Sequence, residues 1–229
     1  MFAFVRALRR IVITFPIFAS AALIFVIGPA LGAGPTAAPP SIELVELRSI
    51  DPTIVVDLRY ACIRNVAGIA LYPVDMPALV RPAVARRLVL AQAFLRRQGC
   101  GLKIWDAYRP KAAQERLWQL TRKTTYVADP DDGIGSLHTR GVAVDATLVD
   151  SHGRELQMPT DFDDFSDAAM IYYRGPDLMI RGNLLMLQRA MARAGFYGLR
   201  TEWWHFCAED WSKYEPVPDL NVALKAAPY

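Results

Sequence analysis

The chain has 229 residues, of which 53% are hydrophobic and 21% are charged. This size and composition predict a folded globular protein of one domain, or barely two, and exclude a disordered chain. The formal net charge of +3 comes from 26 basic and 23 acidic residues, but residues 1–32 alone hold three arginines and no acid. The rest of the chain is therefore close to neutral, which gives no electrostatic support for nucleic-acid binding.

The N-terminal segment is typical of an export signal. Three arginines within the first ten residues precede an apolar run over 11–27, and small residues and prolines follow. We expect a signal peptide over 1–33 and a flexible leader over 34–41, so that the protein is periplasmic or secreted. The alternative is an uncleaved membrane anchor facing the periplasm, because an apolar run of about 17 residues reaches the lower limit for a span.

The remaining chain predicts a mixture of short strands and amphipathic helices. Apolar and β-branched residues predict strands over 42–47 and 53–58, and the Gly- and Pro-rich stretch 65–77 predicts a loop. Helical spacing of apolar residues predicts a helix over 82–98, with a proline in its first turn. The later pattern predicts a strand over 102–107, a helix that begins at Pro110, a turn-rich loop over 129–135, a strand over 143–149, a helix over 183–194 and an extended segment over 202–206. This order predicts one α+β domain over 42–229.

Two polar clusters carry the functional signal. The first contains His138 and Asp145, and the second, roughly 60 residues further along, contains Glu202 and His205. Two imidazoles and one carboxylate, with a fourth position left for water, are typical of a catalytic zinc site. We expect His138, Asp145 and His205 to hold one zinc ion, and Glu202 to act as the general base for its water. The clusters therefore predict a zinc hydrolase.

The spacing of the second cluster leaves an alternative open. Glu202 and His205 are three residues apart, so in a regular strand they would point to opposite faces of the sheet. If both reach one metal site, the segment must be bulged, turned or at the end of a strand. The other assignment makes Glu202 a ligand and moves Asp145 out of the ligand set.

The remaining histidine and the cysteines are expected to lie outside the metal site. His152 lies in a polar turn, and we expect it at the surface. Cys207 follows His205 by two residues, but we expect it to be a buried or strand residue because three ligands are already supplied. Export would allow one pair among Cys62, Cys100 and Cys207 to form a disulfide, and the sequence leaves the pair open.

Two further residues are candidates for catalysis. Arg109, in the stretch Trp-Asp-Ala-Tyr-Arg-Pro, has the planar fork that suits an oxyanion or carboxylate, although position alone favours a surface arginine at a strand end. Near the metal it would hold a tetrahedral transition state. Ser136 would be the nucleophile of a serine hydrolase, but the sequence around it lacks the Gly-x-Ser-x-Gly elbow.

These stretches together resemble the VanX-type D-alanyl-D-alanine dipeptidases, which belong to the zinc peptidase superfamily that includes D-Ala-D-Ala carboxypeptidases and the hedgehog signalling domain. The resemblance spans about residues 42–215. It is carried by stretches in matching order and spacing, namely 57–61 with Asn65 and Gly68, 105–110, Ser136-x-His138-x-x-Gly141-x-Ala143-x-Asp145, 158–163 and 202–205. It implies a hedgehog/D,D-peptidase-like α+β domain with a small, mostly antiparallel sheet flanked by helices.

The resemblance also implies a reaction, the zinc-dependent hydrolysis of D-Ala-D-Ala to free D-alanine. By position it matches the zinc ligands to His138, Asp145 and His205, the general base to Glu202, the arginine that stabilises the transition state to Arg109, and the substrate-binding residues to Ser136 and Asp163. In this comparison the carboxylate of Asp163 pairs with the free ammonium of the dipeptide. By itself, Asp163 would be interpreted as a solvated acid in the acidic stretch 161–167.

Departures from the family pattern fall near the substrate pocket. Relatives often have Thr and Phe where this chain has Cys62 and Val66, and a second serine where it has Leu137. They put the identity of the dipeptide in doubt more than the reaction.

The main alternative is a D,D-carboxypeptidase or endopeptidase acting on peptidoglycan peptides. A non-catalytic zinc-stabilised binding module is the other, and the presence of both Glu202 and Arg109 argues against it. The expected partner is a small D,D-dipeptide, without nucleic acid and without a stable membrane partner unless the N-terminal segment stays uncleaved.

Overall fold

The computed structural model describes residues 43–121 and 126–218. The expected signal peptide and leader, over 1–33 and 34–41, lie outside the described residues. Among the residues that are described, no helix has the length and apolar character needed to cross a membrane.

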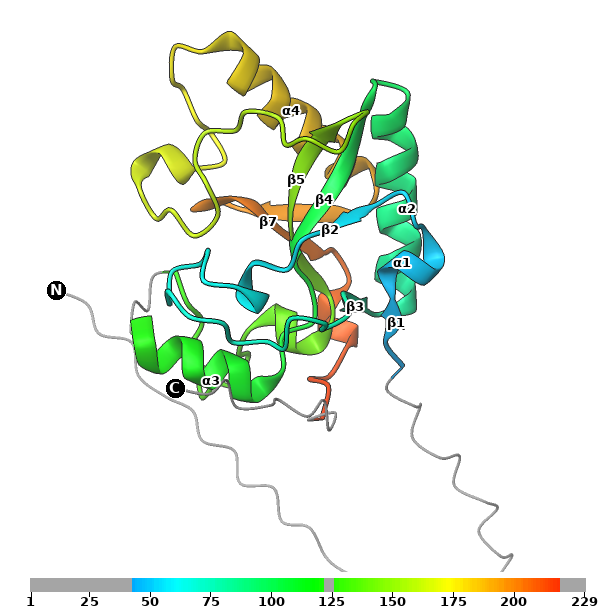
Figure 1. Ribbon diagram of the computed structural model, residues 1–229. Helices are drawn as coiled ribbons and strands as arrows, with labels where there is room; N and C mark the ends of the chain where they lie inside the picture. Colours follow the sequence, from blue (N-terminus) through cyan, green and yellow to red (C-terminus); the bar gives the residue numbers. More distant parts are fainter. Residues whose placement is uncertain (1–42, 122–125, 219–229) are drawn as a thin grey trace, which may run out of the picture. The chain divides into compact units, whose positions relative to one another are not determined.

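A five-stranded sheet with the order β2-β4-β5-β7-β6 forms the centre of the domain (Figure 1). Its strands are β2 (Val55–Val56), β4 (Cys100–Asp106), β5 (Ala143–Asp150), β6 (Phe196–Leu199) and β7 (Glu202–Ala208). Only β2 runs parallel to its neighbour, and the other pairs are antiparallel. The predicted small, mostly antiparallel sheet is therefore confirmed. A separate antiparallel pair joins β1 (Val45–Glu46) to β3 (Leu79–Val80).

Helices flank this sheet. The two long ones, α2 (Pro82–Arg96) and α4 (Leu178–Arg193), contact each other, and they also contact β4 and β6 respectively. The helix α3 (Lys111–Thr121) follows β4, and α1 (Leu47–Ile50) is a single turn that contacts α2. Short 3-10 turns complete the described chain at η1 (Arg59–Ala61), η2 (Leu137–Arg140), η3 (Asp167–Ala169) and η4 (Trp211–Lys213).

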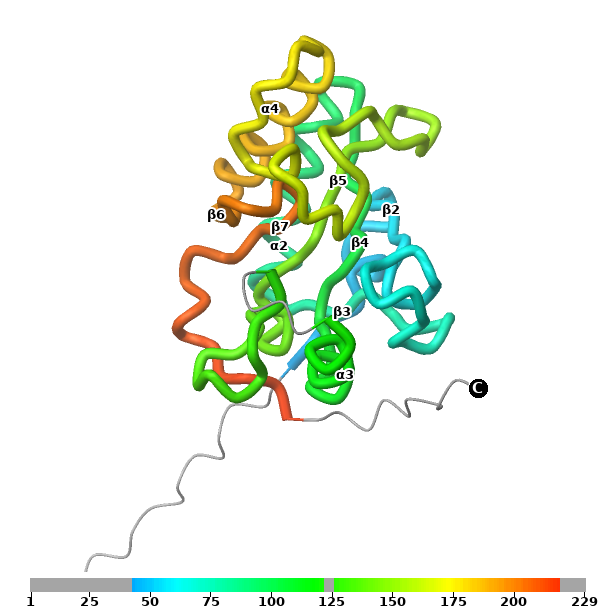
Figure 2. The backbone as a smooth tube through the Cα atoms, turned by 90° about the vertical axis from the view of Figure 1, so that its left-hand side faces the viewer, coloured from blue at the N-terminus to red at the C-terminus, as the bar shows by residue number. Residues whose placement is uncertain are grey.

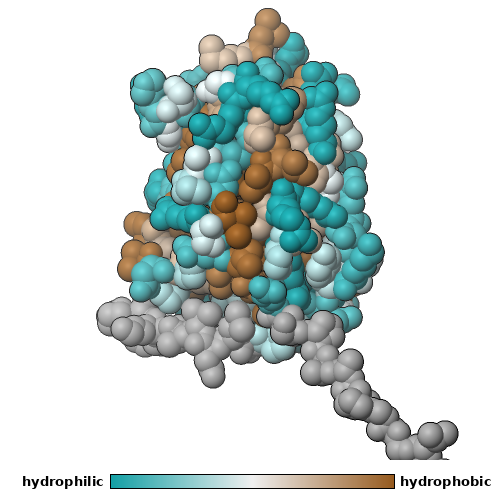
Figure 3. All heavy atoms as spheres, turned by 90° about the vertical axis from the view of Figure 1, so that its right-hand side faces the viewer, coloured by the Kyte–Doolittle hydropathy of each residue, from teal (hydrophilic) through white to brown (hydrophobic). Residues whose placement is uncertain are grey.

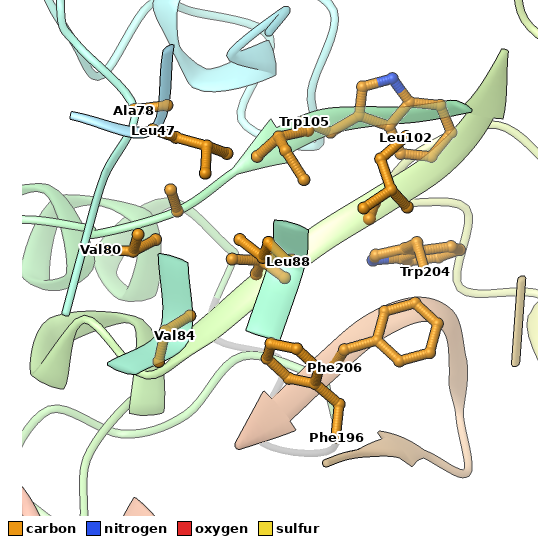
Figure 4. Close-up of a cluster of buried hydrophobic side chains, with 14 of the residues drawn as sticks. Leu47, Ala78, Val80, Val84, Leu88, Leu102, Trp105, Phe196, Trp204 and Phe206 are labelled. Atoms are coloured by element: carbon orange, nitrogen blue, oxygen red, sulfur yellow. The ribbon is translucent and has the colours of Figure 1, made fainter. Parts of the chain in front are cut away.

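The core lies between the sheet and the long helices. Figure 4 shows a single cluster of buried apolar side chains to which α2, β4, β6 and β7 contribute Leu88, Leu102, Phe196, Trp204 and Phe206. All five side chains are at most 2% exposed. Burial of this kind contributes roughly 1.5–3 kcal/mol per large apolar side chain. One outer face carries a narrow run of apolar side chains between hydrophilic ones (Figure 3), as folded domains ordinarily do. The central strands are thus fixed firmly enough to hold side chains at their ends in place.

The structure corrects several predicted boundaries. The strands expected over 42–47 and 53–58 are only two residues each, and the first ends where the helical turn α1 begins at Leu47. The helix expected over 183–194 begins five residues earlier, where Asp177 accepts hydrogen bonds from the backbone N–H groups of Met179 and Ile180. The strand β6 was not predicted. It follows Gly195, whose φ of +83° lets the chain turn directly from α4 into the sheet.

Candidate active site

Three side chains from separate segments meet at one point. His138 lies on η2, Asp145 on β5 and His205 on β7, and their ligand atoms all lie within 4.8 Å of one another. Nδ1 of His205 is 2.9 Å from Oδ1 of Asp145 and 3.2 Å from Nε2 of His138. Asp145 and His205 are direct partners across β5 and β7, which run side by side in Figure 2. The predicted convergence of these three residues is confirmed.

The donor atoms fit a metal ion. Nδ1 of His138 lies 2.8 Å from the carbonyl oxygen of Ala107, which can only accept a hydrogen bond. That nitrogen therefore carries the proton, and Nε2 keeps a free lone pair toward the cluster. His205 presents Nδ1 to the same point. Two neutral imidazoles and a carboxylate are a set that zinc prefers. Glu202 is not part of this cluster of described residues, which favours Asp145 over Glu202 as the third ligand.

The turn before β5 places the first ligand. Ser136 caps η2, and its Oγ accepts a hydrogen bond from the backbone N–H of His138 at 3.3 Å. Gly141 ends the turn with a φ of +68°, and a Cβ there would lie 2.7 Å from Leu44. The positive φ favours glycine at this position, since residues with a Cβ rarely adopt it. This turn orients His138 toward Asp145, which lies seven residues further along the chain, on β5.

A local irregularity brings the second cluster to the same cleft. Leu199 pairs with Glu202 and Gly198 with Phe206, so one step along β6 corresponds to four along β7. The bulge confirms the expectation that the segment 202–205 could not be a regular strand. As a result Glu202 and His205 both line one cavity of about 320 Å³.

Glu202 is buried beside the metal cluster, and one of its carboxylate oxygens is unpaired among the described residues. Its side chain is 7% exposed, and Oε1 has no partner among the described residues. Burial raises the pKa of Glu202 to about 8, although the charge of His205 partly opposes the shift. The raised pKa makes this carboxylate a good proton acceptor. A cation held nearby would favour its ionised form, which is the form that can take a proton.

Arg109 is buried in the cleft and is not a surface residue, so the interpretation from position alone is wrong. Its Nη2 and Nε donate to Oδ2 of Asp106 at 2.7 and 3.0 Å, and its Nη1 donates to Gln114 at 2.7 Å. The guanidinium lies 4.7 Å above the ring of Tyr60 and 4.0 Å from Oδ2 of Asp145. These contacts fix the fork at the edge of the metal cluster, where it can donate to an oxyanion.

Asp163 lies in the same cavity, on the long segment between β5 and α4 that returns beside the sheet (Figure 2). It adopts a φ of +59°, unusual for a residue other than glycine. Its carboxylate accepts hydrogen bonds from the N–H of Val66 at 3.0 Å and the hydroxyl of Tyr60 at 3.3 Å. Asp163 is therefore a constrained acid of the cleft and not a solvated one. Because Val66 acts through its backbone, a changed side chain at that position leaves the contact intact.

The rest of the cavity supplies an apolar wall. Ser136 lines it together with Leu117, Tyr197 and Leu199. The rings of Tyr126 and Phe165 also line it and stack on each other, with their centroids 4.5 Å apart. The combination of a few polar groups with an apolar wall is typical of a small-molecule site.

Comparison with known proteins identifies the family. A family model described as D-Ala-D-Ala dipeptidase matches residues 40–223. The chain belongs to this family. It is 37% identical to the D-alanyl-D-alanine dipeptidase of Escherichia coli, over 77% of this chain and 90% of that protein. It is 29% identical to the D-alanyl-D-alanine dipeptidase of Enterococcus faecalis, over 73% and 91%. A solved D,D-pentapeptidase, a VanY mutant in complex with Zn(II), has 15% identity and a TM-score of 0.41 over 60% of this chain and 77% of that one.

As a member of the D-Ala-D-Ala dipeptidase family, the chain is a zinc metallopeptidase. Its candidate metal site is the cluster of His138, Asp145 and His205. His152 lies outside this site, with its side chain 74% exposed, as the sequence predicted. The three cysteines are all free, so the disulfide that export would allow does not form.

Several residues of the dipeptidase site were missed from the sequence. Asp106 and Gln114 hold Arg109, and the hydroxyl of Tyr72 donates to Asp106 at 2.8 Å. Tyr60 lies between Arg109 and Asp163. Asp106 and Tyr60 were part of the resembling stretches, which was the available signal for them. Nothing in the sequence marked Gln114 or Tyr72.

The position of Asp163 predicts a pH-dependent effect on the stability of the metal-free dipeptidase. Burial, with a further contribution from the charge of Asp145, raises the pKa of Asp163 from 3.8 to about 7. Since the folded-state pKa lies above that of the unfolded chain, stability falls as pH rises from 3.8 to about 7. The loss from this group is up to ~1.4 kcal/mol per pH unit.

We therefore expect Asp163→Asn to be more stable than the parent, by a margin that grows up to about pH 7 and then stays constant. Asparagine also tolerates the positive φ of this position. Urea unfolding of both metal-free proteins at several pH values measures the margin. A margin that does not change with pH would contradict the raised pKa.

Proposed function

We propose that this protein is a zinc-dependent dipeptidase that hydrolyses D-Ala-D-Ala to free D-alanine. The observation that carries the proposal is the convergence, in one cavity, of the metal cluster with the buried carboxylate of Glu202 and the half-buried carboxylate of Asp163. The metal cluster and Glu202 supply a site for catalysis, and Asp163 supplies a partner for a free amine. The curated relatives named D-alanyl-D-alanine dipeptidase support the choice of substrate.

The residues around the cluster have different roles in the reaction. His138, Asp145 and His205 would hold the ion, and a zinc ion bound there would supply a Lewis acid and lower the pKa of water. Glu202 takes the proton of the attacking water and passes it to the nitrogen of the leaving D-alanine. Arg109 donates hydrogen bonds to the oxygen that becomes negative during attack on the peptide carbonyl.

Other residues that line the same cavity select the substrate. The carboxylate of Asp163 pairs with the ammonium of the dipeptide, which favours a free N-terminus and disfavours an acylated one. The hydroxyl of Ser136 accepts a hydrogen bond from His138, so its own proton remains to donate to the substrate. The apolar wall limits the side chains that fit. These features favour a dipeptidase over a carboxypeptidase that acts on longer peptidoglycan peptides.

A single set of assays tests the function. Residues 34–229 are purified, bound metal is measured, and release of D-alanine is followed from D-Ala-D-Ala and from its N-acetylated form. We expect one zinc per chain, loss of activity in a chelator with recovery on adding zinc, and a kcat/KM roughly 10³-fold or more lower for the acetylated substrate. Faster cleavage of the acetylated form would instead support the carboxypeptidase, and activity that resists the chelator would contradict a zinc enzyme.

We also infer that the enzyme acts in the periplasm or outside the cell, where fragments of the wall are released. The support is the order of basic, apolar and small residues over 1–33. In that location the reaction would recover D-alanine from cell-wall material. The N-terminal sequence of protein isolated from the periplasm or medium should begin near residue 34, and a membrane fraction with an intact N-terminus would indicate the anchor. Full-length protein confined to the cytoplasm would contradict export.

A further inference from the structure

Cys207 lies against the outer nitrogen of a candidate metal ligand. It follows His205 by two residues on β7, so the two side chains point to the same face of the sheet. Its Sγ is 3.1 Å from Nε2 of His205. Cys207 is 4% exposed and lines the catalytic cavity, yet none of the roles described above uses it.

The two ring nitrogens of His205 face different groups, the metal cluster at Nδ1 and Cys207 at Nε2. Nδ1 is 2.9 Å from Oδ1 of Asp145 and 3.2 Å from Nε2 of His138, so this nitrogen faces the metal cluster. A neutral imidazole that binds a metal through one nitrogen must carry its proton on the other. The proton on Nε2 then points at Cys207, whose sulfur is the acceptor within reach.

The same arrangement recurs at the other histidine, with a different acceptor. Nδ1 of His138 donates to the carbonyl oxygen of Ala107, which leaves Nε2 for the metal. His138 thus has a strong oxygen acceptor, while His205 has a sulfur atom, which is a weaker one. Nδ1 of His138 also lies 3.5 Å from Oδ2 of Asp106. In both rings the nitrogen away from the cluster therefore has an acceptor close by.

The backbone keeps the sulfur in place. Cys207 pairs with Ala143 on β5 and with Tyr197 on β6, so it lies in the middle of the sheet with a neighbour on each side. Ala143 is fully buried. The thiol therefore has little freedom to leave the ring of His205, and the contact is part of the fold rather than a chance approach of a mobile side chain.

We propose that Cys207 is a positioning residue for the metal site. Its sulfur accepts the Nε2–H hydrogen bond of His205 and so fixes the tautomer and ring orientation with which Nδ1 reaches the ion. The proposal rests on the metal site of the proposed function. Cys207 is not itself a ligand, because its sulfur lies at the nitrogen that faces away from the group of three.

The test compares Cys207→Ser, which keeps an acceptor, with Cys207→Val, which fills the space without one. Cys100→Val, at a half-buried cysteine of β4, is the matched control. Zinc affinity is measured by competition with a chelator. We expect Cys207→Val to bind zinc about 10-fold more weakly, since loss of such a supporting contact lowers metal affinity by roughly 10–100-fold. Cys207→Ser should recover most of the affinity, and the control should match the parent.

A second readout follows the ring protons of the zinc-loaded protein by nuclear magnetic resonance. The chain has three histidines, and His152 is exposed, so we expect slowly exchanging ring N–H signals from His138 and His205. Cys207→Val should lose the His205 signal and keep that of His138, which also reports that the site is folded. Cobalt in place of zinc should show no thiolate-to-metal charge-transfer absorption.

The outcomes separate this proposal from the proposed function. If the parent binds zinc and cleaves D-Ala-D-Ala while Cys207→Val matches it in affinity and ring signals, the positioning role is wrong and the function stands. A charge-transfer band that vanishes in Cys207→Ser would make Cys207 a ligand and also overturn the role. A parent that binds no zinc would contradict the proposed function itself.

Discussion

Replacing Glu202 with glutamine should lower kcat for D-Ala-D-Ala by roughly 10²–10⁴-fold, the range for loss of a general acid–base group. Glutamine has nearly the same shape but takes up no proton, so the attacking water would lose its base. The carboxylate of Glu202 is buried, with Oε1 unpaired among the described residues, so the substitution breaks no hydrogen bond of that oxygen. Turnover of the purified variant, measured by release of D-alanine, checks the expectation.

The loss should occur without loss of the metal. Because His138, Asp145 and His205 form the cluster without Glu202, the variant should still hold one zinc per chain. Glu209→Gln, at an exposed glutamate just beyond β7, is the matched control and should keep the parental activity. Undiminished turnover in Glu202→Gln would refute its role as base. Loss of zinc from the variant would instead restore the alternative in which Glu202 is a ligand.

The ligand set could be predicted because its signal is chemical and local. Histidine is scarce in this chain, and two of its three copies lie close in sequence to a carboxylate, His138 to Asp145 and His205 to Glu202. The helix α2 could also be predicted, because Pro82 and the apolar spacing after it indicate a helix without any tertiary information. Even the bulge in β7 followed from the three-residue spacing of Glu202 and His205.

The supporting contacts could not be predicted, because they join segments that only the fold brings together. Gln114 reaches Arg109 from α3, and the N–H of Val66 reaches Asp163 across 97 positions of the chain. No periodicity encodes such a pair. The contact of Cys207 with His205 is local, yet the sequence predicts only a buried or strand residue there, because it does not give the distance between the two side chains. Position alone likewise placed Arg109 at the surface, whereas the fold buries it.

The burial of Arg109 explains why lysine should not replace it. One carboxylate oxygen of Asp106 and the amide oxygen of Gln114 hold three of its nitrogens, which leaves the guanidinium fixed at the edge of the metal cluster. A lysine ammonium is a single point of charge on a flexible stem and does not satisfy both partners. It would also leave buried acceptors without donors. The positive charge would remain, but its position would not.

We therefore expect Arg109→Lys to lower kcat by roughly 10²–10³-fold, equal to ~2.7–4 kcal/mol of transition-state stabilisation, as for loss of one oxyanion donor. Zinc content should not change, because no candidate ligand is altered. Arg116→Lys, at an exposed arginine of α3, is the control for the same chemical change. Steady-state kinetics on D-Ala-D-Ala give kcat and KM for the parent and both variants. Equal kcat in Arg109→Lys and the parent would show that the charge alone suffices, and a rise in KM with unchanged kcat would move Arg109 from transition-state stabilisation to substrate binding.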